Sequence, residues 1–205
     1  SLATLPEHPV LAARCVGPWQ TRELLNRYYD TDDFALANSQ VALRIRRDGE
    51  QLIQTLKSKG ASVAGLSERN EFDWPLKSNR LVLSHLDTSC WPESLAGLDK
   101  KQLKAVFSTD FKRQFAEIRW LRDGVNTVVE VALDQGLVIA GEQQEDICEV
   151  ELELREGDPA ALLELALELA ADVALMPCDI SKAERGYRLF NANSYSVAAV
   201  PAELS

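Results

Sequence analysis

The sequence lacks the features that identify several large classes of protein. No apolar run approaches the roughly 20 residues that a membrane-spanning helix needs, and no secretory signal is present. Positive charge is in deficit, since the formal net charge is −10 at pH 7. We therefore expect a cytoplasmic protein with no membrane partner, which does not bind nucleic acid or anionic lipid through bulk charge.

Signatures of metal, redox and nucleotide sites are also absent. The four cysteines are far apart and form no CxxC pair, which predicts reduced thiols that are mostly buried. The two histidines, His8 and His85, have no cysteine or histidine at ligand spacing, so a zinc site is not expected. Neither a GxxxxGK(S/T) loop nor a GxGxxG loop occurs, so the common nucleotide-binding folds are not supported.

A globular composition and a series of alternating strands remain. The 205 residues are 46% hydrophobic and 26% charged, which is ordinary for a protein with a real core. Residues 41–47, 51–58 and 68–73 read as three consecutive strands. Asp48-Gly49 is a two-residue hairpin signal, so the first two of these strands are predicted to pair antiparallel.

The charged side chains of the three strands are expected on one side of the predicted sheet, because residues two apart on a strand share a face. The charged residues concerned are Arg44, Arg46, Lys57, Arg69 and Glu71. One such strand alone is more typical of a solvated outer face, where exposed ion pairs contribute little. Three of them together, with a self-repelling acidic face over 149–153, favour a binding site over a solvated surface.

The remaining elements complete an α+β prediction. Strands are predicted at 20–30, 106–109, 112–121, 126–134 and 145–154, helices at 92–104 and 159–174, and a last ordered element at 181–190. About eight antiparallel strands with charge on one side indicate a closed barrel, because closure removes exposed edges. Its interior must hold water, ions or a charged ligand, since buried unpaired charge is too costly. Residues 1–190 are predicted to form one domain, and residues 191–205 a tail or linker.

Two sets of charged residues define the predicted site. The basic set is Arg44, Arg46, Lys57, Arg69, Arg113, Lys182 and Arg185, and the acidic set is Glu71, Glu130, Asp134, Glu149, Glu151 and Glu153. Arginine forks suit phosphate oxygens and lysine acts as a point charge, while carboxylates suit a hard cation such as Mg²⁺. Both sets on one interior predict a metal–polyphosphate ligand, with the metal neutralising charge and positioning a water for attack.

Eight segments, taken in their order along the chain, resemble those of one family. They are YYDT at 28–31, ALRIRR at 42–47, TLK at 55–57, GLSERNEFD at 65–73, FSTDFKR at 107–113, VEVALDQG at 129–136, CEVELEL at 148–154 and SKAERGY at 181–187. The sequence resembles the CYTH superfamily, also called triphosphate tunnel metalloenzymes, and within it the bacterial inorganic triphosphatases. Each segment alone is a weak signal, but the series covers nearly the whole chain and is highly specific.

The resemblance implies an antiparallel eight-stranded closed tunnel with flanking helices. It implies that triphosphate is bound by Arg44, Arg46, Lys57, Arg69, Arg113 and Lys182, and that Mg²⁺ or Mn²⁺ is held by Glu151 and Glu153 with Glu149 or Asp134. The family's first strand, Glu-x-Glu-x-Lys, has no match here and is expected to be missing from this chain. Many bacterial relatives carry a C-terminal helical CHAD domain, and the tail after Asn191 would be the linker to it.

The predicted function is metal-dependent hydrolysis of inorganic triphosphate, or a similar short polyphosphate, to pyrophosphate and phosphate. Lys57, Lys182 and Glu151 are the catalytic candidates. The general base stays open between a carboxylate of the 149–153 strand and a water held by lysine. The alternatives are an adenylyl cyclase of the same family, for which no base pocket is assignable, and a polyphosphate-binding module without turnover.

Overall fold

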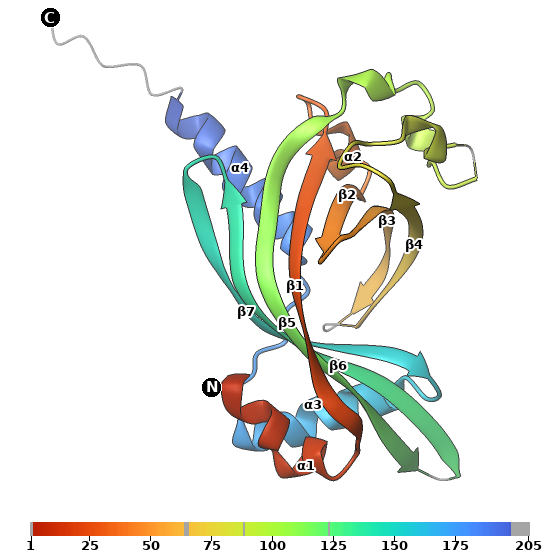
Figure 1. Ribbon diagram of the computed structural model, residues 1–205, viewed down its shortest axis with the longest axis vertical. Helices are drawn as coiled ribbons and strands as arrows, with labels where there is room; N and C mark the ends of the chain where they lie inside the picture. Colours follow the sequence, from red (N-terminus) through yellow and green to blue (C-terminus); the bar gives the residue numbers. More distant parts are fainter. Residues whose placement is uncertain (1, 64–65, 88, 123, 198–205) are drawn as a thin grey trace, which may run out of the picture. The chain divides into compact units, whose positions relative to one another are not determined.

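The computed structural model describes residues 2–63, 66–87, 89–122 and 124–197, and this part of the chain contains one antiparallel sheet of seven strands (Figure 1). The strands are β1 (Cys15–Asp30), β2 (Val41–Asp48), β3 (Gln51–Val63), β4 (Leu66–Leu76), β5 (Lys104–Arg122), β6 (Val125–Ala140) and β7 (Gln143–Glu156). Their order in the sheet is β4-β3-β2-β1-β5-β6-β7. The predicted antiparallel α+β class is confirmed. Within the described residues no pairing joins the outer strands β4 and β7, so closure into a barrel stays a prediction.

Short helices and turns connect these strands, and two longer helices follow the last strand. They are η1 (Leu2–Glu7), α1 (Pro9–Ala12), α2 (Ala35–Asn38), η2 (Leu83–His85), η3 (Glu93–Leu95), η4 (Lys100–Gln102), α3 (Ala160–Asp172) and α4 (Lys182–Val197). In the part of the chain that the structure describes, none of the helices combines the length and the hydropathy that crossing a bilayer requires.

The chain divides into two compact units that share the long strands. The first unit comprises Ser1–Glu23, Phe111–Gly136 and Ile147–Pro177. The second unit comprises Leu24–Asp110, Leu137–Asp146 and Cys178–Ser205. Strands β1, β5, β6 and β7 each contribute residues to both units, and each unit is described below by itself.

The hairpin between β2 and β3 forms as predicted, with its turn one residue later. Asp48 pairs with Gln51, which leaves Gly49 and Glu50 as the turn. Gly49 has a φ of 58°, in the left-handed region that glycine enters without steric cost. This register places Leu43 opposite Leu56, so the apolar residues of the two strands meet on one face.

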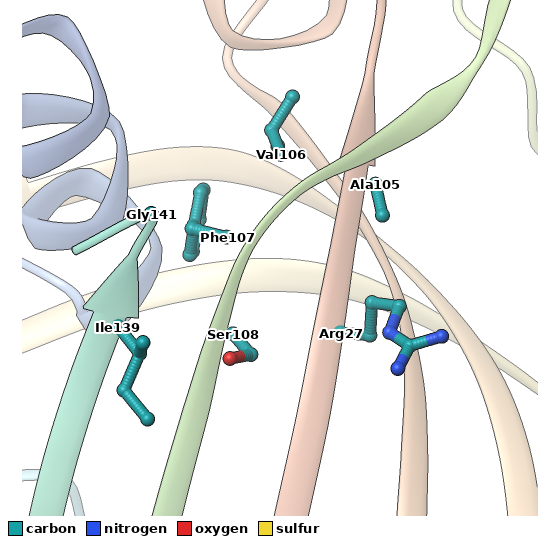
Figure 2. Close-up of a pocket in the computed structure, with 7 residues that line it drawn as sticks. All are labelled: Arg27, Ala105, Val106, Phe107, Ser108, Ile139 and Gly141. Atoms are coloured by element: carbon teal, nitrogen blue, oxygen red, sulfur yellow. The ribbon is translucent and has the colours of Figure 1, made fainter. Parts of the chain in front are cut away.

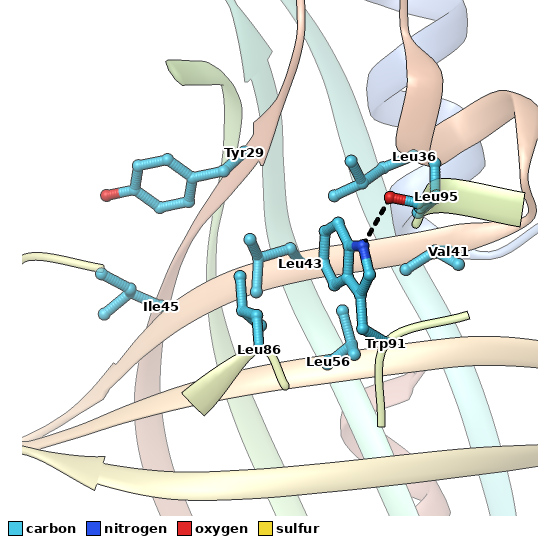
Figure 3. Packing of buried hydrophobic residues seen from close by; sticks show 9 residues of the cluster. All are labelled: Tyr29, Leu36, Val41, Leu43, Ile45, Leu56, Leu86, Trp91 and Leu95. Carbon is cyan, nitrogen blue, oxygen red and sulfur yellow. Dashed lines mark hydrogen bonds between the residues drawn. The ribbon is translucent and has the colours of Figure 1, made fainter. Parts of the chain in front are cut away.

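That apolar face carries the hydrophobic core of the second unit. Leu43, Ile45 and Leu56 are at most 2% exposed and belong to one cluster with residues of the segment after β4 (Figure 3). From that segment, Leu86 and Trp91 pack into the cluster, and the Trp91 ring nitrogen donates a hydrogen bond to a backbone carbonyl 2.8 Å away. Each fully buried leucine or isoleucine contributes roughly 1.5–3 kcal/mol. This burial fixes which face of β2 and β3 points away from the core.

The helix predicted at 92–104 is wrong. The segment contains two short 3₁₀ turns, Glu93–Leu95 and Lys100–Gln102, and no α-helix. Asp99 is extended, with φ −72° and ψ 101°, and its side chain accepts a hydrogen bond from the Lys101 backbone. The apolar residues therefore reach the core from separate turns, because the extended backbone at Asp99 interrupts any continuous helix.

Two other boundaries differ from prediction. β5 is one strand, whereas two strands at 106–109 and 112–121 were expected. Asp110 is exposed within β5, so its weak strand preference does not break the ladder. The last ordered element, expected at 181–190, is a helix that continues to Val197.

The cysteines are reduced as predicted, but the expectation that most are buried is wrong. Cys15 and Cys90 are half-buried, while Cys148 and Cys178 are exposed, and all four are free. Cys148 alternates with Ile147, which is 2% exposed, so the thiol takes the outer face of its strand.

Helix α3 matches the predicted helix closely and completes the first unit. The Asp158 carboxylate accepts a hydrogen bond from the Ala160 backbone N–H at 2.9 Å, which caps the helix start. The buried residues of α3 recur at helical spacing and are Ala161, Leu162, Leu165 and Leu169. The apolar face of this helix is therefore occupied by packing.

Helix α4 approaches β5 closely in the second unit, and a glycine permits this contact. A Cβ atom at Gly186 would lie 2.1 Å from the Phe107 ring, so any larger residue forces the helix or the ring to move. The other face of the contact is aromatic, since Tyr28 stacks on Phe107 with ring centroids 4.6 Å apart.

Candidate functional site

Three cations gather on the face of β2 and β3 that points away from the core. Arg44 and Arg46 alternate with the core residues of β2, and Lys57 lies on β3 opposite Ala42. Arg44 is 7% exposed and the Lys57 side chain is 27% exposed. We call Arg44, Arg46 and Lys57 the cationic cluster. The pairing of β2 with β3 thus places these three side chains on one face, as predicted.

One carboxylate lies within the cationic cluster. The Lys57 Nζ is 2.8 Å from one oxygen of Glu71, and an Arg44 guanidinium nitrogen is 3.4 Å from the other. Burial alone would raise the pKa of Glu71, but Lys57 and Arg44 lower it below its ordinary value. Glu71, predicted as a metal ligand, is therefore placed among cations.

Even with Glu71 present, the cationic cluster is short of negative charge. Burial and the neighbouring Arg44 lower the pKa of Lys57, and Glu71 only partly opposes them. A lowered lysine pKa means that the protonated form is disfavoured where it stands. An anion in this place would favour the protonated form, so the charge of the cluster suits an anionic ligand.

The structure adds Tyr28, which sequence reasoning did not include in the site. Tyr28 pairs with Arg44 across the β1–β2 ladder and is 4% exposed. Burial would raise the pKa of its phenol, but Arg44, Arg46 and Lys57 lower it below the ordinary value. The signal was present in the sequence, because Asn26, Tyr28 and Asp30 alternate on the strand predicted at 20–30.

The first unit contains a convergence of acidic side chains. Asp134 on β6 and Glu149 and Glu151 on β7 each offer an oxygen, and these atoms lie within 4.8 Å of one another. Asp134 is fully buried. We call these three residues the acidic group. Across residues 2–63, 66–87, 89–122 and 124–197, Glu71, Glu130 and Glu153 are not part of it.

Arg113 on β5 is bound to the acidic group. Its guanidinium donates to both oxygens of Asp134, at 2.8 and 2.7 Å, and also to Glu151. Burial would lower the pKa of Arg113, but Asp134 and Glu151 raise it above its ordinary value. A residue predicted to bind triphosphate therefore partly neutralises the carboxylates in this structure.

Two other predicted metal ligands are held by a different arginine. Arg155 on β7 donates to Glu130 and to Glu153, at 2.8 Å in each case. All three side chains belong to the first unit, and Glu153 and Arg155 are exposed. Glu153 shares a strand face with Glu151 by spacing, yet it accepts its hydrogen bond from Arg155.

The predicted basic residues near the end of the chain lie on α4. Lys182 is 9% exposed at the helix start. Arg185 donates to Glu145 at 2.7 Å, and Arg188 contacts the same carboxylate at 2.9 Å. Arg69 lies in β4, but its side chain is outside the described residues. Arg185 therefore ties α4 to the start of β7.

A separate cavity of about 220 Å³ in the second unit contains none of the predicted site residues. Its walls come from β1, β5 and β6, and Figure 2 shows Arg27, Ser108 and Ile139 from these strands. It is lined by one cation and no carboxylate. This composition does not suit a polyphosphate or a metal.

The acidic group fits a divalent cation by its donor chemistry. Three carboxylates with oxygens this close repel one another and match the oxygen ligands that Mg²⁺ and Mn²⁺ prefer. Arg113 supplies one positive charge, which leaves the group of four side chains with an excess of negative charge.

The described part of the chain thus combines an antiparallel sheet with a cationic cluster in one unit and an acidic group in the other. A model of the CYTH domain family matches residues 5–187. The chain therefore belongs to the CYTH family, and the resemblance inferred from the eight segments is confirmed.

The chain is similar to one curated protein in sequence and to one solved structure in fold. An inorganic triphosphatase from Haemophilus influenzae is 36% identical over 185 residues, which are 90% of this chain and 50% of that protein. The chain thus spans half the length of the curated relative that it matches. A solved structure from Hippeastrum, an adenylyl cyclase candidate described as having a dominant triphosphatase activity, has 18% identity and a TM-score of 0.58. It covers 100% of this chain and 93% of its own, and it supports the fold.

Proposed function

We propose that this chain hydrolyses inorganic triphosphate to pyrophosphate and phosphate with the help of Mg²⁺ or Mn²⁺. The observation that carries the proposal is the cationic cluster, in which three partly buried cations share a strand face and two of them, Arg44 and Lys57, contact one carboxylate. The 36% identical relative named inorganic triphosphatase supports the choice of substrate. A short polyphosphate has the several closely spaced negative charges that such a cluster would match.

The residues of the cluster have distinct roles in this proposal. Arg44 and Arg46 bind phosphate oxygens through their guanidinium forks, and Lys57 acts as a point charge on the same ligand. Lys182, buried at the start of α4, would be a further ligand and a catalytic candidate with Lys57. Stabilising the charge that develops on the phosphoryl oxygens is the main contribution expected of such groups. Arg69 remains a proposed ligand.

The acidic group supplies the proposed metal site. Asp134, Glu149 and Glu151 would hold the divalent cation, with Glu151 the catalytic candidate among them. When bound, such a cation neutralises phosphate charge and polarises a phosphoryl oxygen. Arg113, already bound to two of these carboxylates, would keep them oriented.

The reaction consumes one water per triphosphate, and no covalent intermediate is required. The water oxygen forms a bond to the terminal phosphorus while the bridging P–O bond breaks, and pyrophosphate leaves. The water protons pass to solvent or to the departing phosphate. The protein's contribution is therefore orientation and charge stabilisation, and no protein nucleophile is assigned.

Phosphate release from triphosphate tests this proposal directly. We expect turnover with Mg²⁺ or Mn²⁺, faster on triphosphate than on ATP at equal metal, because no aromatic base clamp is assigned. Arg44→Ala should remove most of this activity, whereas Arg47→Ala is the matched control on the same strand. Arg47 is exposed and takes the other face of β2. Cyclic AMP formation without triphosphate hydrolysis would instead support a cyclase, and triphosphate binding without turnover would support a binding module.

A further inference from the structure

A buried amide connects the cationic cluster to the neighbouring strand. Asn26 on β1 is fully buried, and its carbonyl oxygen accepts a hydrogen bond from the Arg46 Nε–H at 2.8 Å. Its amide nitrogen donates to the hydroxyl of Thr109 on β5 at 2.9 Å. Thr109 is also fully buried. Three strands that are adjacent in the sheet therefore share one hydrogen-bonded chain.

The chemistry of this chain fixes the direction of the amide. An asparagine side chain has an acceptor end and a donor end, while the Nε of arginine can only donate. Thr109 provides the acceptor that the amide nitrogen needs, so the carbonyl end is left facing Arg46. If the amide turned over, two donors would face each other in a buried place, which is costly.

The choice of an amide over a carboxylate also preserves charge. Arg113 is held by the carboxylate of Asp134, which cancels its positive charge locally. Asn26 holds Arg46 at the same 2.8 Å distance through a neutral oxygen. A neutral acceptor orients the guanidinium without itself cancelling the positive charge.

We propose that Asn26 and Thr109 are positioning residues that hold the Arg46 guanidinium in the orientation needed to bind triphosphate. This inference rests on the proposed function. Asn26 acts through Arg46, and Thr109 acts through Asn26. A purely structural role, in which the chain only ties β1 to its neighbours, makes different predictions for substrate binding.

The first test is a set of threonine variants measured in two backgrounds. Thr109→Val keeps the shape but removes the acceptor, and we expect KM for triphosphate to rise by about two- to tenfold. Thr109→Ser keeps the hydroxyl and should restore the parent KM. In the Arg46→Lys background, which lacks the Nε–H fork, Thr109→Val should produce no further rise.

The matched control is Thr127→Val in the first unit. Thr127 is 2% exposed and its hydroxyl accepts a hydrogen bond from the Asp158 backbone at 3.0 Å, so a buried threonine again loses one accepted bond. This variant should lower Tm without changing KM. An equal rise in KM for Thr109→Val in both backgrounds would mean a structural role and would overturn the inference.

The second test does not depend on turnover. The ¹⁵N–¹H signal of the Arg46 Nε–H, assigned by its loss in Arg46→Lys, should be protected from exchange in the parent and in Thr109→Ser. Thr109→Val should expose it. Asn26→Asp should retain the protected signal but weaken triphosphate binding, because the carboxylate still accepts from Arg46 while cancelling its charge.

The outcomes separate this inference from the proposed function. A parent protein that neither binds nor hydrolyses triphosphate defeats the proposed function, and the inference falls with it. The inference alone is defeated by a different result. In that case the parent hydrolyses triphosphate normally, and Thr109→Val changes neither the Nε–H signal nor the KM. If Thr109→Val does not fold, loss of the protected signal in Asn26→Asp overturns the inference instead.

Discussion

The cationic cluster of the second unit and the acidic group of the first unit carry opposite charges but have a similar composition. In the former, Arg44 and Lys57 contact one carboxylate, Glu71, and Arg46 shares their strand face. In the latter, Asp134 and Glu151 contact one guanidinium, Arg113, and Glu149 adds a third carboxylate to the group. Each has a single member of the minority charge that reduces repulsion among the rest. Each therefore keeps an excess of one charge sign, which under the proposed function attracts phosphate in one case and a divalent cation in the other.

The two regions also differ in how their arginines are held. Arg46 bonds to a neutral amide, while Arg113 bonds to two carboxylates, which raise its pKa. The comparison teaches that strand position alone does not define an arginine's role. Arg46 and Arg113 both lie on strands of one sheet, yet one is held by an amide and the other by carboxylates.

The largest effect is expected from removing an arginine of the cationic cluster. A charge-assisted bond from arginine to phosphate contributes about 1.5–3 kcal/mol, so Arg44→Ala or Arg46→Ala should lower kcat/KM for triphosphate by roughly ten- to a hundredfold. Arg47→Ala, whose side chain is exposed at the end of the face that carries Leu43 and Ile45, should stay within about twofold of the parent. Equal losses at Arg44, Arg46 and Arg47 would show that the two faces of β2 do not differ.

The next effect concerns metal binding by the acidic group. Mg²⁺ or Mn²⁺ should raise the Tm of the parent, because bound cations relieve repulsion among the carboxylates. The double variant Glu149→Gln, Glu151→Gln should lose this response. Glu130→Gln with Glu153→Gln is the control, since both carboxylates are held by Arg155. Loss of the Tm response in the control pair alone would move the metal site to Glu130 and Glu153.

The pH dependence of triphosphate affinity tests the charge of Lys57. This lysine must be protonated to attract phosphate, and burial with Arg44 lowers its pKa below 10.5. Triphosphate affinity should therefore fall as the pH rises through a value below 10.5. Glu71 supports the protonated form, so Glu71→Gln should move this alkaline limb to lower pH, while Glu50→Gln, at the exposed turn, should not. A limb that moves to higher pH in Glu71→Gln would contradict the ion pair.

The lowered pKa of Lys57 also makes the free energy of unfolding depend on pH. The folded-state pKa of Lys57 is depressed, so the unfolded chain binds the proton more tightly. Protonated Lys57 therefore costs stability at neutral pH, and this cost is relieved as the pH rises from the folded-state pKa toward 10.5. Bound triphosphate should reduce the cost at neutral pH.

The smallest effect is expected at the contact between α4 and the start of β7. Glu145 accepts from Arg185 and Arg188, and these bonds outweigh its burial and lower its pKa. Glu145→Gln should lower Tm by about 2–4 °C, because the contact is partly exposed to solvent. Glu142→Gln, exposed in the preceding turn, should not change Tm. A large loss of triphosphate affinity in Glu145→Gln would mean that this contact also positions Lys182.

Much of the fold could be predicted from the sequence, because it depends on local periodicity. The alternation of Leu43 and Ile45 with Arg44 and Arg46 predicted both the strand and the side that carries charge. The segment at 92–104 was mispredicted, because its apolar residues serve a core formed by distant strands. Local patterns do not record that the backbone can reach such a core through separate turns.

The sequence predicted which strand face each site residue occupies, but not which residue it contacts. Spacing placed Glu151 and Glu153 together, yet the structure pairs the former with Arg113 and the latter with Arg155. Likewise, Glu71 meets Lys57 through the register of β3 and β4 and is placed with the cations. The two-residue repeat of a strand determines which face a side chain occupies. The register between strands determines which side chain it contacts on the neighbouring strand.

Calorimetric titration with each ligand separately tests the central claim most directly, namely that the two regions bind opposite charges. Triphosphate, titrated without divalent metal, should bind the parent and the Glu149→Gln, Glu151→Gln variant, and should bind Arg44→Ala at least tenfold more weakly. Mg²⁺, titrated without triphosphate, should bind the parent and Arg44→Ala but not the acidic double variant. Triphosphate binding that survives Arg44→Ala unchanged, or Mg²⁺ binding that survives the loss of both glutamates, would contradict the account.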